Sequence, residues 1–363
     1  MKILILQDFL RSGGTERQCV LLANAFAAAG QEVTLVTFRP GGALAGTVGA
    51  AVRRVTLQPF DLGLDWFAPG LIAAVRKAAP EVILCLGRMA NCHGWRLARF
   101  APVVATMRTG KTLPDWFRRT LRGAARVVAN SEDARSTAIA AAGLPPERVS
   151  VIYNSLVFPP AAAGTPRNEP LRSALGVGAG TTVLLDVAMF RPEKNQRELL
   201  EIVAGLPEEA DWQLWLAGDG PARAACEQRA RELGAASARV RFLGFHADPA
   251  PLYAAADIAV HASWSEALSN FLIEAQAHGL PAVASAAQGI RECFLSGETG
   301  WEIPPGNRVA FREALTRLMT EPAAERARRA DRARTFARDR FDPARQVRAY
   351  LDLFAAVTAA RRS

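Results

Sequence analysis

Two glutamates mark the stretch SWSEALSNFLIEAQAHG, Ser263–Gly279, as a place where chemistry could occur. Glu266 and Glu274 are eight positions apart, and apolar side chains surround them. Charged side chains are rarely buried unless they have partners, so this setting raises the question of a ligand. Taken alone, the two glutamates would more often be solvated, one in a turn and one on a helix surface. The rest of the chain decides between these interpretations.

The local pattern around the glutamates predicts a strand–helix–strand unit. A Ser-Asn pair is a suitable N-cap and Gly279 is a stop signal, so residues 270–278 are predicted to form a short helix. Apolar runs over residues 256–263 and 280–285 predict the flanking strands. In such units, ligands bind beyond the carboxyl ends of the strands, where the N–H groups at a helix start suit a phosphate.

A pair of basic residues follows another predicted strand, TTVLLDVAMF. Arg191 and Lys194 are three positions apart in RPEKNQ, at the carboxyl end of that strand. A guanidinium fork and an ammonium group together suit a diphosphate. The alternative interpretation is an ordinary charged turn on the surface.

Two glycine-containing loops also follow predicted strands. In SGGTERQ, Gly13 and Gly14 leave the backbone accessible at a helix start, which suits a phosphate or a sugar, although a tight turn explains them equally well. In LAGDGP, Gly218 begins a GxG sequence, but Arg223 occupies the third glycine position. The dinucleotide-binding fingerprint therefore fails, and a turn near a ligand is the better interpretation.

The organisation of the chain predicts an α/β protein with two doubly wound domains. Its 363 residues suffice for two cores, and β-rich runs alternate with Ala-rich helical stretches in both halves. A Pro- and Gly-rich stretch, 158–170, is predicted to be a linker. We expect a first domain over 1–160, a second over 161–340, and an amphipathic C-terminal helix over 341–363.

The net charge of +9 lies in the first half of the chain. Residues 1–160 contain 19 basic and 10 acidic residues, whereas residues 161–363 contain 25 of each. This excess predicts an anionic partner. Residues 107–126 carry six basic residues and one acid, with Trp116 and Phe117 among them, a mixture that suits an anionic membrane surface on a helix. A solvated helix face is the alternative. Nucleic acid is the rival partner, but no recognition motif supports it.

Cysteine, histidine and hydropathy patterns narrow the class further. The five cysteines are scattered without a CxxC motif, which favours reduced thiols in a cytoplasm. The four histidines show no metal-ligand spacing, and no Asp-x-Asp metal motif occurs. No apolar run is long enough to cross a bilayer, and the N-terminus is predicted to be a core strand rather than a signal peptide.

Together these motifs resemble glycosyltransferase family 4, whose members are retaining enzymes with the GT-B fold and a Glu-x7-Glu element. The resemblance covers nearly the whole chain. It rests on the pieces SGGTERQ, ANSEDAR, RVSVIYNS, MFRPEKNQRELL, LAGDGP, VRFLGF, YAAADIAVHASWSEALSNFLIEAQAHGLPAVAS and ECFLSGETGWEIPPGN. It implies two Rossmann-like domains that face each other across a cleft, an acceptor-side first domain, a nucleotide-sugar-binding second domain, and a C-terminal helix that crosses back to the first.

The resemblance also implies residue roles. Arg191 and Lys194 would bind the donor diphosphate and support departure of the leaving group. Glu274 would accept hydrogen bonds from the ribose, and Glu266 would face the hydroxyls of the transferred sugar. The remaining donor-binding positions would be Gly13 and Gly14 near the sugar and phosphate, Gly218 in a nearby turn, the backbone N–H groups of Leu268, Ser269 and Asn270 at the phosphate, and Phe245 and His246 at the nucleobase.

One position departs from the family pattern. Members often have a histidine after the strand that corresponds to PVVATM, where it contacts the donor sugar, but Arg108 stands there in this chain. An arginine can still meet a phosphate or sugar oxygen, so we place Arg108 at the site. His93 is the nearest alternative histidine, and we interpret it as structural.

The resulting prediction is a metal-independent, retaining glycosyltransferase that needs no cofactor. Its donor would be a nucleotide-diphosphate sugar, with UDP preferred, and its acceptor a glycan or a polyprenyl- or lipid-linked glycan. We expect a cytoplasmic protein at the membrane face, with no nucleic acid as partner. The alternatives are a nucleotide-sugar epimerase or glycan phosphorylase on the same fold, and a non-enzymatic basic membrane or nucleic-acid adaptor. The four lysines are few for a phosphorylase, which would need one to hold pyridoxal phosphate.

Overall fold

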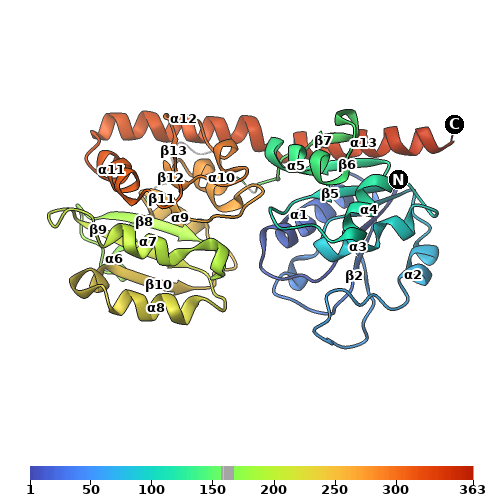
Figure 1. The fold of residues 1–363 in the computed structure, drawn as a ribbon, viewed down its shortest axis with the longest axis horizontal. Coiled ribbons are helices and arrows are strands. Elements are labelled where there is room, and N and C mark those ends of the chain that lie inside the picture. Colours follow the sequence, from blue (N-terminus) through green and yellow to red (C-terminus); the bar gives the residue numbers. More distant parts are fainter. Residues whose placement is uncertain (157, 159–166, 363) are drawn as a thin grey trace. The chain divides into compact units, whose positions relative to one another are not determined.

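The computed structural model describes residues 1–156, 158 and 167–362, which form two units. Unit 1 consists of Met1–Ser155 and Phe341–Ser363, and unit 2 consists of Leu156–Arg340. Each unit has its own sheet, and the colours of Figure 1 follow the chain through both. The predicted boundary at 160/161 and most of the predicted linker lie outside the described residues.

In the described residues, unit 1 contains a seven-stranded parallel sheet in the order β3-β2-β1-β4-β5-β6-β7. Its strands are β1 (Lys2–Gln7), β2 (Glu32–Thr37), β3 (Arg53–Thr56), β4 (Val82–Cys85), β5 (Val103–Met107), β6 (Arg126–Ala129) and β7 (Val149–Val151). Its helices are α1 (Gly14–Ala28), α2 (Leu71–Ala78), α3 (Arg88–Leu97), α4 (Asp115–Gly123), α5 (Glu132–Ala142) and α13 (Pro343–Arg362). Buried side chains of α2 to α5 form the core on one face, and those of α1 and α13 form it on the other.

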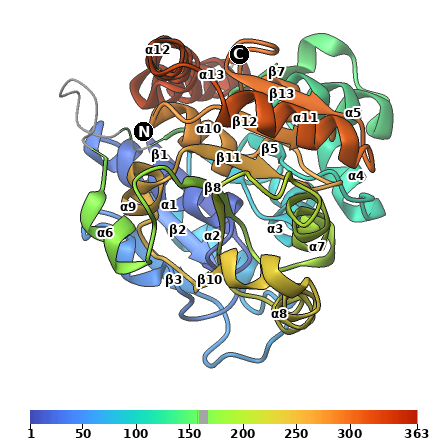
Figure 2. The ribbon, with the colours of Figure 1, turned by 90° about the vertical axis from the view of Figure 1, so that its left-hand side faces the viewer.

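The described part of unit 2 contains a six-stranded parallel sheet in the order β10-β9-β8-β11-β12-β13. Its strands are β8 (Thr182–Val187), β9 (Trp212–Ala217), β10 (Val240–Gly244), β11 (Ile258–His261), β12 (Ala282–Ser285) and β13 (Gly300–Ile303). Its helices are α6 (Glu169–Ala174), α7 (Gln196–Val203), α8 (Arg223–Arg231), α9 (Ala250–Ala255), α10 (Asn270–Ala277), α11 (Arg308–Met319) and α12 (Ala323–Phe341). Figure 2 shows α7, α8 and α11 on one face of this sheet and α6, α9 and α10 on the other.

The central strands form where the sequence has continuous apolar runs. Parallel sheets covered by helices on both faces bury both sides of each strand, so such runs need not alternate with polar residues. The run KILILQ is buried after its first residue, and WQLWLA is buried throughout. The α/β, doubly wound prediction is therefore confirmed in both units.

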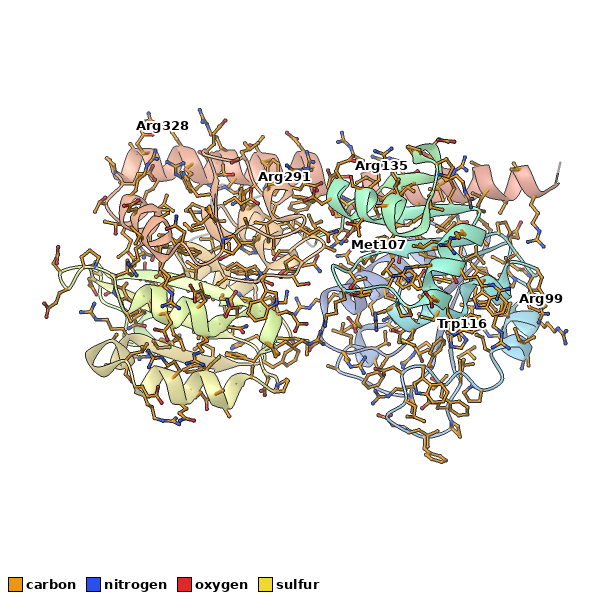
Figure 3. All side chains as sticks on the ribbon, in the orientation of Figure 1. Arg99, Met107, Trp116, Arg135, Arg291 and Arg328 are labelled. Carbon is orange, nitrogen blue, oxygen red and sulfur yellow. The ribbon has the colours of Figure 1, made fainter. Side chains whose placement is uncertain are left out.

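The predicted helix face over 107–126 needs correction. Met107 ends β5, α4 begins only at Asp115, and Arg126 begins β6, so one part of the segment is helical. Phe117 is buried in the core of unit 1, whereas Trp116 is exposed on the outside of α4 (Figure 3). The buried position follows from α4 packing its apolar side on the sheet, so Phe117 does not contribute to a surface.

Candidate active site

The carboxyl ends of β8 and β11 lie side by side in the middle of the sheet of unit 2. From β8 the chain proceeds outward to β9 and β10, and it then returns to β11 on the other side of β8. Connections that leave two adjacent strands in opposite directions open a crevice at their carboxyl ends, and ligands of doubly wound folds bind there. The predicted residues Lys194 and Glu266 follow these two strands.

Main-chain contacts join the two loops at this crevice. The carbonyl oxygen of Glu193 accepts a hydrogen bond from Ser263 Oγ at 2.9 Å and from the N–H group of Trp264 at 3.1 Å. Glu193 belongs to the short 3-10 helix η3 (Pro192–Lys194). Because the loop after β8 is tied to the loop after β11, Lys194 is held beside Glu266.

Glu266 is anchored through one of its two carboxylate oxygens. Lys194 Nζ and His261 Nε2 both contact Oε1, the latter at 2.8 Å. No described residue makes a hydrogen bond to Oε2, although the residue is only 8% exposed. Burial raises the pKa of Glu266, but the Lys194 charge and His261 outweigh it and hold that pKa at about 2. The carboxylate is therefore ionised, fixed and open at one oxygen.

Glu274 lies on α10 and is held from α9. The hydroxyl of Tyr253 donates a hydrogen bond to its Oε2 at 2.6 Å. Ser269 caps α10 by accepting a hydrogen bond from the N–H group of Leu272, so the predicted helix start is confirmed. The N–H groups of the first helical turn have no acceptor within a helix, so the segment Leu268–Asn270 can offer donors to an anion.

The other predicted donor-binding residues of unit 2 follow strands β8, β9 and β10, and they differ in exposure and in contacts. Gly218 follows β9 with φ of 140°, and a side chain there would strike the carbonyl oxygen of Ala188 after β8, so the turn requires glycine. Phe245 is exposed and His246 half-buried after β10, one strand farther from β8. The side chain of Arg191 has no hydrogen bond or ion pair to any described residue, so its convergence with Lys194 remains a prediction.

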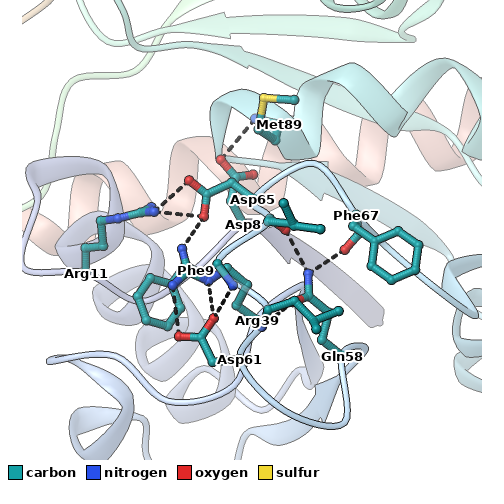
Figure 4. A network of polar contacts seen from close by, with 12 residues as sticks. Asp8, Phe9, Arg11, Arg39, Gln58, Asp61, Asp65, Phe67 and Met89 are labelled. Atoms are coloured by element: carbon teal, nitrogen blue, oxygen red, sulfur yellow. Dashed lines mark hydrogen bonds and ion pairs between the residues drawn. The ribbon is translucent and has the colours of Figure 1, made fainter.

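Unit 1 has a corresponding crevice between β1 and β4, and Asp8 lies in it. The Asp8 carboxylate accepts hydrogen bonds from the N–H groups of Met89 and Ala90 at the start of α3 (Figure 4). Burial raises its pKa to about 7 despite these hydrogen bonds. Gly13 and Gly14 open α1 at the same edge, and Gly13 has a φ of −76°, so its conformation does not require glycine.

A network of ion pairs holds the loop after β3 over this edge of unit 1. Arg39 binds Asp61 and Asp65, each at 2.7 Å, and Arg11 binds Asp65 at 2.6 Å (Figure 4). The guanidinium of Arg39 also lies 4.1 Å from the ring centre of Phe9. These contacts hold the loop in place, and two aromatic residues of the same loop, Phe60 and Trp66, are exposed to solvent.

Arg108 and His93 both have protein partners. Arg108 donates to Asn154 Oδ1 at 2.5 Å and to the hydroxyl of Tyr350 on α13 at 2.9 Å, while its Nε is buried without a partner among the described residues. His93 Nε2 lies 3.0 Å from the carbonyl oxygen of Trp66, and burial lowers its pKa. The structure therefore gives His93 a structural contact, and the predicted ligand role of Arg108 is not tested by these contacts.

Two residues at the crevice of unit 2 were missed by sequence reasoning. His261 ends β11, and its Nδ1 lies 2.8 Å from Oδ1 of Asp186 on β8. Both side chains are almost completely buried. The available signal was a polar residue near the carboxyl end of an apolar run in each of two strands, but nothing in the sequence indicates that the two strands are neighbours.

Two searches of the described residues concern metals and membranes. Residues 1–156, 158 and 167–362 contain no group of three or more His, Cys, Asp or Glu side chains placed to hold a metal ion. No helix among them combines the length and the apolar character needed to span a bilayer.

Family models match both units of the chain. Residues 12–156 match the model described as Glycosyltransferase Family 4, and residues 181–321 match the one described as Glycosyl transferases group 1. A lipopolysaccharide core biosynthesis glycosyltransferase of Rhizobium meliloti, LpsE, is 29% identical over 352 residues, which cover 96% of this chain and 97% of LpsE. The D-inositol 3-phosphate glycosyltransferase of Mycobacterium bovis is 29% identical over 324 residues, covering 78% of this chain and 66% of that protein.

Solved structures agree with the family match. Anabaena HepE in complex with UDP-glucose is 26% identical with a TM-score of 0.80, and the match covers 98% of this chain and 100% of HepE. A glycosyltransferase from Rickettsia africae, 20% identical, has the same fold with a TM-score of 0.82 over 98% of both chains. These matches confirm the predicted resemblance: the chain belongs to glycosyltransferase family 4 and is a transferase with the two-domain GT-B fold.

Proposed function

We propose that this glycosyltransferase moves a sugar from a UDP-sugar to a glycan or lipid-linked acceptor in the synthesis of cell-surface polysaccharide or glycolipid. We further propose that it retains the anomeric configuration and uses neither a metal nor a cofactor. HepE, which is 25–26% identical in its complexes with UDP and UDP-glucose, supports the choice of donor. LpsE and LpsD of Rhizobium meliloti, both named for lipopolysaccharide core biosynthesis, support the choice of acceptor.

The observation that carries the proposal is the open oxygen of Glu266. An ionised carboxylate accepts hydrogen bonds and donates none, so Oε2 suits the hydroxyl groups of a sugar. Lys194 has three N–H donors and uses one on Oε1, which leaves donors for a diphosphate. An acceptor for sugar hydroxyls and a cation for phosphate thus stand together at the crevice where doubly wound folds bind ligands.

The proposed step breaks the bond between the anomeric carbon and a diphosphate oxygen. The acceptor hydroxyl oxygen forms its bond to that carbon on the same face, and its proton leaves with the diphosphate. Negative charge grows on the leaving group, where Lys194, Arg191 and the first N–H groups of α10 would stabilise it. Fixed donors of this kind contribute about 3 kcal/mol each to a transition state. These positive groups would take the part that a divalent metal has in other transferases.

A panel of nucleotide sugars tests the donor and the stereochemistry. We expect the rate of sugar transfer, or of slow hydrolysis, to be higher with UDP-sugars than with other nucleotide sugars. Proton NMR spectra should show that the product has the same anomeric configuration as the donor. Glu266→Gln should turn over slowly, and Glu208→Gln, an exposed glutamate of the same unit, should match the wild type. An inverted product would contradict retention. Interconversion of nucleotide sugars without an acceptor would support the epimerase alternative instead.

The outer surface of α3 and α4 is proposed to bind an anionic membrane. Trp95 and Trp116 stack with ring centres 5.4 Å apart, and the Arg119 guanidinium lies 3.8 Å from the Trp95 ring centre. The exposed apolar loop after β3 adjoins this surface, because His93 of α3 contacts the carbonyl oxygen of Trp66. Trp and Arg side chains together are typical of interfaces with lipid headgroups.

Vesicle binding tests the membrane proposal. Each basic residue contributes about 1 kcal/mol near an anionic leaflet, so Arg118→Ala/Arg119→Ala should bind phosphatidylglycerol vesicles roughly 30-fold more weakly. Arg328→Ala/Arg332→Ala on α12 makes the same charge change in unit 2 and should bind as the wild type does. Equal losses in the two double variants would show that net charge, and not this surface, determines binding.

A further inference from the structure

We propose that His261 carries a proton on both ring nitrogens and positions the Glu266 carboxylate, and that Asp186 keeps it in that state. His261 would then be a positioning residue, one that acts on the donor sugar only through Glu266. This inference rests on the proposed function, in which Glu266 accepts a hydrogen bond from the transferred sugar. It assigns a function to the buried polar contacts that link Asp186 on β8, His261 on β11 and Glu266.

The proton assignment follows from the geometry of the two contacts. Each ring nitrogen of His261 lies 2.8 Å from a carboxylate oxygen, Nδ1 from Asp186 and Nε2 from Glu266. Ionised carboxylates only accept hydrogen bonds, and a neutral imidazole has one N–H group. In a neutral ring, one of the two nitrogens would therefore point its lone pair at a lone pair of a carboxylate oxygen. An imidazolium ion satisfies both. Although burial opposes the charged form, the two carboxylates raise the pKa of His261.

The side chains around His261 support a charged imidazole. Lys194 binds the same Glu266 oxygen, so two carboxylates and two cations form a balanced buried cluster. Two thiols whose pKa burial raises lie near the carboxylates, Cys293 near Glu266 and Cys226 near Asp186. Charged side chains also act on these thiols, Arg197 on Cys226, and Glu292 and Arg340 on Cys293. The ring of Phe271 packs beside His261 at 5.6 Å between ring centres. The ring nitrogens of His261 contact the two carboxylates directly, so the imidazolium depends on them for compensation of its charge.

The arrangement has a consequence for the donor. Both cationic groups hold Oε1, so rotation of the Glu266 carboxylate would break two charged contacts at once. Oε2 is thereby kept towards the crevice without a further residue to direct it. A neutral His261 would either present a bare Nε2 to Oε1, which is repulsive, or keep an uncharged N–H group there, which is a weaker anchor. In both cases Lys194 becomes the main anchor of the carboxylate.

Asp186→Asn separates positioning from a structural role. The new amide can accept from Nδ1–H or, when turned over, donate to a bare Nδ1, and in both arrangements the charge that stabilises the second proton is gone. We expect near wild-type kcat at pH 6 and a fall of at least about 10-fold by pH 9, the scale of one hydrogen bond to a charged group. The wild type should show no such fall. His261→Gln should have a low kcat at every pH. Both variants should bind UDP normally, because His261 and Asp186 act through Glu266, which is proposed to contact the sugar.

Asp257→Asn is the matched control. Asp257 precedes β11 at its opposite end and accepts hydrogen bonds from Arg172 and from the N–H group of Val183. This variant should lower the free energy of unfolding without adding a pH dependence to kcat. If Asp186→Asn behaves in the same way, Asp186 is merely structural and the proposal is wrong.

Nitrogen NMR of the imidazole rings tests the proton without any activity. The chain has four histidines, so His261→Gln identifies the signal. At pH 8 both ring nitrogens of His261 should be protonated, while His278, whose pKa burial lowers to about 4, should be neutral. A neutral His261 at pH 8 would overturn the proposal, even if the sugar transfer is found. Conversely, a doubly protonated His261 together with a fully active Glu266→Gln would leave the proton assignment intact and remove the proposed role of Glu266.

Discussion

The hydroxyl of Tyr253 donates a hydrogen bond to the carboxylate of Glu274 across 2.6 Å, from α9 to α10. His278, which caps the C-terminal end of α10, packs its ring against Tyr253 with ring centres 4.9 Å apart. The tyrosine is therefore held in place and can fix the carboxylate proposed to bind the ribose. Because that contact is made before and during the reaction, its effect should appear in binding.

Tyr253→Phe should weaken UDP binding by about 10-fold with little change in kcat, since it removes one hydrogen bond to a charged group and keeps the ring. Calorimetry with UDP and steady-state kinetics measure the two effects. Tyr153→Phe, in unit 1, serves as the control because Tyr153 packs its ring against Phe341, far in sequence from α10. A variant with unchanged UDP affinity and reduced kcat would show that Glu274 does not act on the nucleotide.

Glu266→Gln and Glu274→Gln should fail in different ways. Glu274→Gln should mainly raise the KM for the donor and weaken binding of UDP. Glu266→Gln should bind UDP nearly normally and lose turnover, because its contact tightens as positive charge develops at the anomeric carbon. Equal losses of UDP affinity in the two variants would abolish this division of roles.

Lys194→Ala and Arg191→Ala should each reduce turnover by about 100-fold or more, which is the scale for one transition-state donor. Both proteins should remain folded by circular dichroism, since both side chains are partly exposed to solvent. Of these two side chains, Lys194 alone has an ion-pair partner among the described residues. A loss of turnover in both variants therefore cannot come from a broken ion pair alone. Near wild-type turnover in both would refute the diphosphate assignment.

Turnover should survive treatment with EDTA. The proposed diphosphate site relies on Lys194, Arg191 and the N–H groups at the start of α10, so no divalent ion is needed for charge. The measurement is the initial rate before and after chelation, followed by addition of Mn²⁺ or Mg²⁺. Loss of activity that either metal restores would refute metal independence.

The buried carboxyl of Asp8 should make stability depend on pH. Its pKa is about 7 in the folded protein, against 3.8 for an unperturbed aspartate. Between these values the folded state retains a proton that the unfolded state has lost, so this group's contribution to the free energy of unfolding falls as pH rises. Urea unfolding at pH 5 and pH 8 should show that Asp8→Asn costs less at pH 8. A cost that is the same at both pH values would mean that Asp8 stays ionised.

The elements that the sequence predicts well are those whose signal is local. Ser269 caps α10 as expected, and the apolar runs of the central strands appear as β8, β9 and β11. The edge strands β3 and β13 were not predicted. The first has the sequence RRVT with no fully buried residue, so it lacks the apolar run that identifies central strands. An edge strand needs only one neighbour, and its residues need not be apolar.

The parts of the site that sequence could not predict depend on distant neighbours. Asp186 and His261 are 75 positions apart and meet only because β11 returns to pair with β8 after β9 and β10 have formed. Arg108 illustrates the same limit, because one of its partners, Tyr350, is 242 positions away on α13. A single sequence shows residue types at strand ends, but the order of strands in the sheet decides which of them touch.

The packing of α13 on unit 1 has a consequence for how the protein is made. Tyr350, Phe354 and Val357 share a core with Ile3 and Phe26, so one face of the first sheet is covered by residues from the other end of the chain. During synthesis, unit 2 leaves the ribosome complete before this helix does. The unit that begins first must therefore finish folding last, and in the interval its apolar face is open to chaperones and to aggregation.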